Sequence, residues 1–214
     1  FEVCNNGSDF APHPRAPNHP VEKFWDVVNA FRQIQGSPLL YGVGSDDAHF
    51  YDAKRINDQS GVGDAWVMVH AASLTPKHLI EAMHQGDFYA TSGVLLEGVA
   101  FTPADRTLRV TVRADQGVKY RIHFITTKRG FDQKVTAFSS PAEENRPART
   151  IPEYSDEIGK TVKTVQGVEA TYQMKADDLY VRARVESDIP STITPHFHPE
   201  VKMAWTQPYT TGSH

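Results

Sequence analysis

The hydrophobic pattern changes character once along this chain, near residue 95, and that change limits the fold more than any other feature. Before it, apolar residues follow helical spacing over 21–35 and form short continuous runs over 39–44 and 65–71. After it, apolar and polar residues alternate. Helical spacing beside continuous runs is typical of α/β segments with buried parallel strands, whereas alternation is typical of antiparallel sheets. The sequence therefore predicts an α+β chain, with an α/β part over 1–94 and an antiparallel β-sandwich over 95–214.

Within the first part, the pattern predicts parallel strands at 1–5 and 39–44 joined by the helix at 21–35. A further strand at 65–71 leads to a short helix that Thr75 and Pro76 open and Gly86 ends. In the second part we expect no long helix between 106 and 175. The expected strands there lie at 108–113, 120–125, 168–175, 180–186 and 201–206. The polar stretch 132–167 reads as a long loop with one strand at most.

Composition excludes several classes of protein. Of 214 residues, 39% are hydrophobic and 22% charged, which is ordinary for a globular chain. The net charge is −4, and no basic run marks a nucleic-acid partner. No apolar run approaches the roughly 20 residues of a membrane span, so no membrane partner is expected. The one cysteine, Cys4, cannot form an internal disulfide, and the start at Phe1 without Met predicts a processed or partial chain.

The segment Gly44-Ser45-Asp46-Asp47-Ala48-His49 carries the sharpest chemical signal. It follows directly on the expected strand 39–44, and ligand sites in α/β sheets lie where parallel strands end. Asp47 and His49 are two residues apart, so in extended chain both side chains point the same way. A carboxylate and an imidazole on one face suit a divalent metal. The same residues are also typical of an Asx turn, and spacing alone leaves both interpretations open.

This segment resembles the end of the last barrel strand in the PHP family, named for polymerase and histidinol phosphatase domains, which carries a Gly-x-x-Asp-x-His-type motif. The similarity extends along nearly the whole chain. Residues 1–5 resemble the strand before the last, and the helix that contains Phe24-Trp25-Asp26 resembles the helix between those two strands. Four further segments resemble the region after the barrel in a PHP subgroup with a β-rich tail: 65–69, 80–93, 180–184 and 204–208.

The resemblance implies a partial PHP-type α/β barrel segment followed by an antiparallel β-sandwich. It also implies metal-dependent hydrolysis of a small phosphoester by metal-activated water. Asp47 and His49 match the last two metal ligands of the family, and Asp46 would be a second-shell or loop residue. His13 and His19 are the less favoured additional ligands. The metal would be zinc, manganese or iron, bound weakly by this chain alone.

The chain departs from the family by omission, because the earlier ligand segments, a His-x-His and an Asp-His pair, do not precede Phe1. We therefore expect a homo-oligomer, or a complex with a chain that supplies the missing barrel strands. The alternative is a non-catalytic, truncated PHP relative that serves as an assembly or binding module.

Other chemistry-bearing residues have simpler explanations. His196 and His198 form a His-x-His that reads as a polar connection before the last strand. His123 alternates with core residues and should face solvent. Cys4 lies in an expected buried strand, where cysteine is usually inert. No phosphate-binding glycine loop and no Gly-x-Ser-x-Gly elbow is present, so neither motif competes with the metal-assisted hydrolysis that the resemblance implies.

Overall fold

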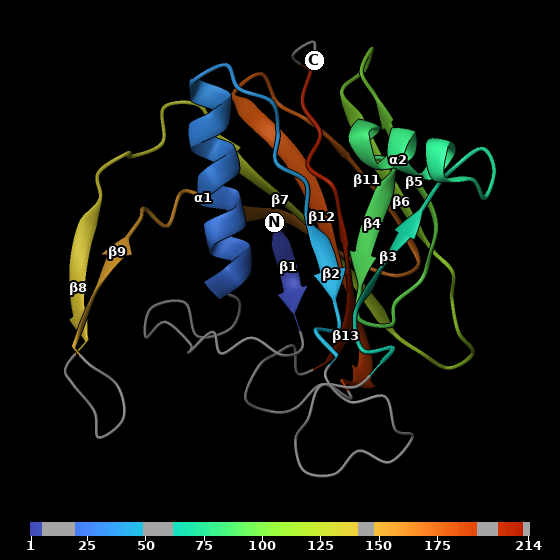
Figure 1. The fold of residues 1–214 in the computed structure, drawn as a ribbon. Helices are drawn as coiled ribbons and strands as arrows, with labels where there is room; N and C mark the ends of the chain where they lie inside the picture. The colour runs from blue at the N-terminus through green and yellow to red at the C-terminus, as the bar shows by residue number, and fades with distance from the viewer. Residues whose placement is uncertain (6–19, 49–61, 141–147, 192–200, 212–214) are drawn as a thin grey trace.

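An antiparallel six-stranded sheet with the order β10-β7-β12-β13-β4-β3 forms the centre of this β-rich α+β fold (Figure 1). The computed structural model describes residues 1–5, 20–48, 62–140, 148–191 and 201–211. The described helices are α1 (Pro20–Ile34) and α2 (Pro76–Gln85). The described strands are β1 (Glu2–Asn5), β2 (Val43–Ser45), β3 (Trp66–Val69), β4 (Phe88–Thr91), β5 (Leu96–Thr102), β6 (Thr107–Val112), β7 (Tyr120–Lys128), β8 (Thr136–Ser140), β9 (Arg149–Glu153), β10 (Lys160–Gln166), β11 (Glu169–Gln173), β12 (Asp178–Pro190) and β13 (Val201–Thr206).

A second, three-stranded sheet with the order β11-β6-β5 faces the large sheet across the main core. Alternating apolar residues supply this core, because every second side chain of a strand points to the same face. Leu108 and Val110 of β6 lie in one cluster with Ile122 and Phe124 of β7, and all four are fully buried. The arrangement is compatible with the β-sandwich that the alternating pattern predicts.

The first part of the chain contains the predicted parallel pair. β1 pairs with β2 in parallel, Cys4 opposite Gly44 and Asn5 opposite Ser45, and α1 connects the two strands. α1 is buried on two sides. Its Trp25 packs in a cluster with residues of β1, β4 and β13, and its Val27 and Ala30 pack in another cluster. The helix thus packs against both the parallel pair and the large sheet.

The short helix α2 confirms the predicted start and stop signals. Thr75 is the N-cap, and its side chain accepts the backbone N–H of His78. Pro76 follows at the first helical position, where its missing N–H costs nothing. Gly86 ends the helix with φ of 79°, a left-handed conformation that favours glycine. Neither described helix is long and apolar enough to cross a membrane.

The prediction of a continuous strand over 39–44 was wrong, since the strand β2 covers only Val43–Ser45. In the residues before β2, side-chain amides form the backbone hydrogen bonds that a neighbouring strand would otherwise form. Asn29 bonds both the N–H and the carbonyl of Leu40, and Gln207 does the same for Gly42 at 2.7 and 2.8 Å. Hydrophobicity alone indicated a buried segment, but it could not show that side chains satisfy the backbone.

The prediction of a loop with at most one strand over 132–167 was also wrong, because β8, β9 and β10 all lie there. Most of the described residues in these strands are exposed, so the alternation that marks a half-buried strand is missing. β10 joins the large sheet beside β7, whereas β8 and β9 pair with each other as a hairpin. No long helix occurs in the described residues between 106 and 175.

Candidate functional site

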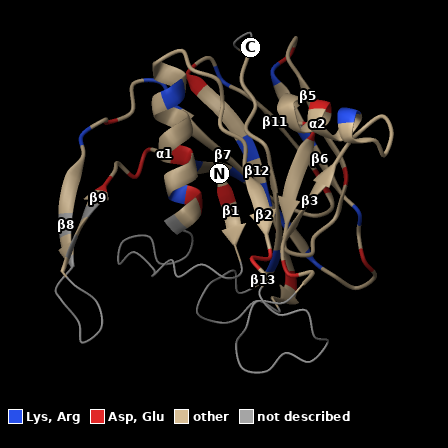
Figure 2. Ribbon diagram, viewed as in Figure 1, with Lys and Arg blue, Asp and Glu red and all other residues tan. Residues whose placement is uncertain are grey.

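The parallel pair β1 and β2 brings Asn5 and Ser45 to the same edge, because parallel strands in register end together. The helix α1 packs against β1, where its Trp25 lies in one cluster with Val3 and Cys4. Polar residues follow β2 at once, as the sequence predicts for a ligand site. Figure 2 shows acidic residues gathered near the end of β2.

Asp46 has a structural role at this edge. Its carboxylate accepts three backbone N–H groups, from Gly63 at 2.9 Å, Asp64 at 2.7 Å and Ala65 at 2.6 Å. Hydrogen bonds to a charged acceptor are stronger than neutral ones. Asp46 therefore fastens the residues that lead into β3 to the end of β2, and a second-shell role at a metal remains a prediction.

Asp47 differs from its neighbour in conformation and exposure. Its side chain is exposed, and its φ of 48° lies in the left-handed region, which aspartate adopts more easily than most residues. Its backbone N–H donates to the hydroxyl of Ser45 at 3.3 Å. Because the chain turns here, Asp46 and Asp47 do not share one environment.

The histidines predicted as metal ligands, His49, His13 and His19, lie outside the described residues, as do His196 and His198. Within the described part of the chain, no three His, Cys, Asp or Glu side chains come together in a group that could hold a metal ion. The pairing of Asp47 with His49 thus remains a prediction from the sequence.

The end of the parallel pair carries a negative electrostatic field. Cys4 is buried in β1, and burial together with the charges of Glu22, Asp46 and Asp64 raises the pKa of its thiol to about 12. The thiol therefore stays protonated at neutral pH and is a poor nucleophile. The same charges that disfavour a thiolate favour a cation nearby.

A buried ionic network, which the sequence analysis missed, holds α1 against the large sheet. Arg182 of β12 is 1% exposed and donates to Glu22 at 2.9 Å and to both carboxylate oxygens of Asp26 at 2.8 and 2.6 Å. Its guanidinium also lies 4.9 Å from the centre of the Trp25 ring. The indole N–H of Trp205 donates to Glu22 at 2.8 Å. These contacts fix the first half of α1, and through it the position of β1.

The sequence does contain a signal for this network. Glu22 and Asp26 are four residues apart on an amphipathic helix, so they lie on one face. Arg182 and Arg184 alternate with apolar residues in a strand. Charged residues at buried positions are rarely unpaired. An acidic pair on a helix and a basic pair in a core strand could therefore have been predicted to meet.

The expectation that His123 faces solvent was wrong. Its side chain is only 12% exposed, and its Nε2 lies 3.2 Å from a carboxylate oxygen of Glu186. Arg121 and Arg184 also contact Glu186, at 2.8 and 2.9 Å. Burial by itself would raise the pKa of Glu186, but His123 and the two arginines outweigh it and lower the pKa to about 2. The neighbouring strands β7 and β12 thus pair charged side chains on the face away from the main core.

In comparisons with known proteins, no family model matches the sequence, and neither a curated protein nor a solved structure matches it.

Proposed function

We propose that this chain is the C-terminal portion of a PHP-type metal-dependent phosphoester hydrolase. In this proposal Asp47 and His49, at the end of β2, supply two ligands to a divalent metal, which is zinc, manganese or iron. The PHP-type barrel of the complete enzyme belongs to the proposal as well, because the described residues contain one parallel strand pair and no closed barrel.

The geometry of the β1-α1-β2 unit is the observation that carries this proposal. The motif with Asp47 starts where two parallel strands end, the usual place of ligand sites in α/β folds. Asp46 is engaged with three backbone N–H groups, and Asp47 is the aspartate that matches the ligand position of the PHP motif. The outer edge of β1 pairs with no other described strand, and a further barrel strand would pair there.

The electrostatics of the strand ends also support a cation. Asp46 and Asp64 both raise the pKa of the Cys4 thiol, so their negative charges act on β1. A bound divalent metal would lower the pKa of a bound water and neutralise charge on a phosphate. Asp47 would be a ligand of the metal just after the end of β2, and the negative surroundings would raise the local concentration of cations.

Two protein ligands leave most coordination positions to other groups, whereas a catalytic zinc typically has three protein ligands. We therefore expect the isolated chain to bind divalent metal weakly and to have negligible phosphoesterase activity. The test titrates zinc and manganese into the chain and into an Asp47→Ala, His49→Ala double variant. It then assays both proteins with an aryl phosphate. Asp156→Ala with His84→Ala is the matched control, since both residues are exposed and distant in sequence from the motif.

Metal affinity is expected to fall in the Asp47→Ala, His49→Ala variant and to stay unchanged in the control. Equal affinity in all three proteins would overturn the proposed ligands. A His13→Ala, His19→Ala variant shows whether these histidines add to the site. Turnover by the unmodified chain clearly above that of the Asp47→Ala, His49→Ala variant would show that the site is complete in this chain.

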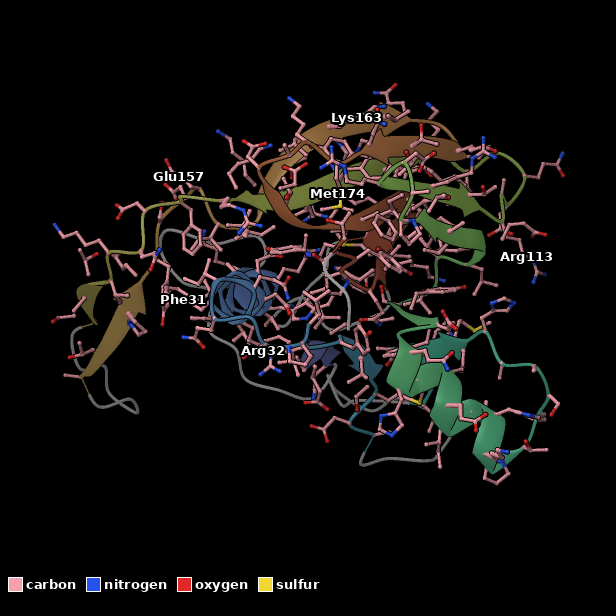
Figure 3. The ribbon with its side chains drawn as sticks, turned by 90° about the horizontal axis from the view of Figure 1, so that it is seen from above. Phe31, Arg32, Arg113, Glu157, Lys163 and Met174 are labelled. Carbon is pink, nitrogen blue, oxygen red and sulfur yellow. The ribbon has the colours of Figure 1, made fainter. Side chains whose placement is uncertain are left out.

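A second candidate function, as an assembly module, is favoured by the hairpin β8–β9. The hairpin projects away from the rest of the molecule (Figure 3), and its strands pair only with each other among the described residues. An isolated two-stranded hairpin is marginally stable in water, so a partner would stabilise it. Light scattering at micromolar concentration tests this function. A dimer or larger assembly that Val135→Asp weakens would support it, and a monodisperse monomer would contradict it.

A further inference from the structure

A cavity of about 270 Å³ lies at the opposite end of β3 from the candidate metal edge. It is lined from β3, β4, the start of β5, and Tyr209 near the C-terminal end of the described chain. β3 and β5 are the outer strands of their two sheets, so the cavity opens where both sheets have an edge. A small ligand or a protruding side chain could enter from either edge.

Three aromatic residues are among those that line the cavity, and a further contact holds the ring of each in place. The hydroxyl of Tyr89 accepts the backbone N–H of Leu96 at 2.9 Å. The ring of Tyr209 stacks on Phe101 with 5.3 Å between ring centres. Phe88 packs edge-on against Tyr41 at 6.0 Å. Because the rings are already fixed, a ligand would lose little free energy in ordering them.

The charged side chains that line the cavity are acidic. Asp87 and Glu97 contribute carboxylates, His70 an imidazole, and no lysine or arginine is among the lining residues. Within the described part of the chain, neither carboxylate forms a salt bridge. The negative charge of Asp87 also reaches the wall, since it adds to burial in raising the pKa of the Tyr209 hydroxyl.

Arg113, which does not line the cavity, affects the pKa of the lining residue Tyr89. The charge of Arg113 works to lower the pKa of Tyr89, but burial outweighs it and the pKa is raised. In Figure 3 the Arg113 side chain lies at the outer margin of the molecule, and it is not a lining residue. The cavity lining therefore combines aromatic residues with two exposed carboxylates and contains no lysine or arginine.

From this combination we infer that the cavity binds an organic cation, an alkylammonium or guanidinium group. Such a group is attracted to aromatic faces and to carboxylates at the same time. A small amine could present it, and so could a lysine or arginine side chain of another protein segment. A metal ion fits less well, because no three ligand side chains come together in the described residues. An anion would meet two carboxylates.

Calorimetric titration of the chain with choline tests the inference. The neutral isostere 3,3-dimethylbutan-1-ol has nearly the same shape without the charge. Saturable binding is expected for choline, with an affinity about threefold above that of the alcohol, because Asp87 and Glu97 are exposed and ion pairs between exposed charges contribute little free energy. Equal binding of both compounds would overturn the inference, since the cavity would then recognise shape alone.

The double variant Asp87→Asn, Glu97→Gln is expected to lose about threefold in choline affinity, while Asp156→Asn, Glu169→Gln keeps it. Thermal unfolding of both variants checks that the fold is intact. Unchanged affinity in the first variant would contradict the inference.

A comparison of N-acetyl-lysine N-methylamide with its norleucine counterpart identifies the source of the cation. Stronger binding of the lysine compound than of choline assigns a side chain, and the reverse assigns a free amine. Absence of saturable binding by every cation up to about 10 mM would overturn the inference.

Discussion

Acidic side chains lie in two regions of this molecule, and they are treated differently in each. At the interface of α1 with β12, Glu22 and Asp26 are buried and bound by Arg182. At the end of β2, Asp46 is held by backbone N–H groups and Asp47 is exposed. In the first region the carboxylates are paired with the guanidinium of Arg182, so their charges stabilise the fold. The second region keeps a negative field at an open edge, so its charges are suited to a ligand.

The largest effect should come from removing the cation of the first region. Arg182→Ala removes the cation that binds Asp26 and one of the two arginines at Glu22, which is expected to lower the free energy of unfolding by about 3–5 kcal/mol. Urea denaturation measures it. Arg109→Ala is the control, because Arg109 pairs with Glu169 at the surface and its loss should cost less than about 1 kcal/mol. Similar losses for both arginines would show that the buried network is not what holds α1.

The second region should separate two neighbouring aspartates. Asp46→Asn places an amide where three backbone N–H groups now meet a charged acceptor, and we expect a loss of about 2–3 kcal/mol. Asp47→Asn keeps a residue that tolerates the left-handed conformation and should change the free energy of unfolding by less than about 0.5 kcal/mol. Thermal unfolding at one pH compares the two variants. A larger loss for Asp47→Asn would reverse the assigned roles.

A smaller effect should appear as a pH dependence at Glu186. Its pKa is lowered from 4.5 to about 2, so its contribution is complete above pH 4.5 and is lost as the pH falls toward 2. Glu186→Gln removes this contribution. The stability difference between wild type and variant should therefore shrink by about 1–2 kcal/mol across this window. Urea denaturation at several pH values measures it, with the exposed Glu169→Gln as control. A constant difference would mean that the Glu186 contacts do not form in solution.

The features that the sequence could predict depend on local signals. Local signals sufficed for α2, because Thr75, Pro76 and Gly86 act on adjacent backbone. The parallel pair and α1 followed from hydrophobic patterns. The position of Asp47 at the end of β2 followed from its place after an apolar run. These predictions depend on residues close in sequence.

What the sequence analysis missed depends largely on residues far apart in the chain. Gln207 completes the backbone of Gly42 across 165 positions, and Arg182 meets Asp26 across 156. Periodicity placed His123 toward solvent, but the neighbouring strand brings Glu186 beside it. The sequences of β8 and β9 show no alternation of apolar and polar residues, so no pattern in the sequence predicted that hairpin. The cavity beside β3 forms from four separate segments and has no motif at all.

The metal claim is tested most directly by nuclear magnetic resonance with Mn²⁺, which broadens signals only close to the bound ion. In the wild-type chain, amide signals of residues 45–48 and of Asn5 should broaden first, at low Mn²⁺. In the Asp47→Ala, His49→Ala variant they should stay sharp, whereas the Asp156→Ala, His84→Ala control should behave like wild type. Broadening centred elsewhere, or unchanged in the first variant, would contradict the assignment of Asp47 and His49 as metal ligands.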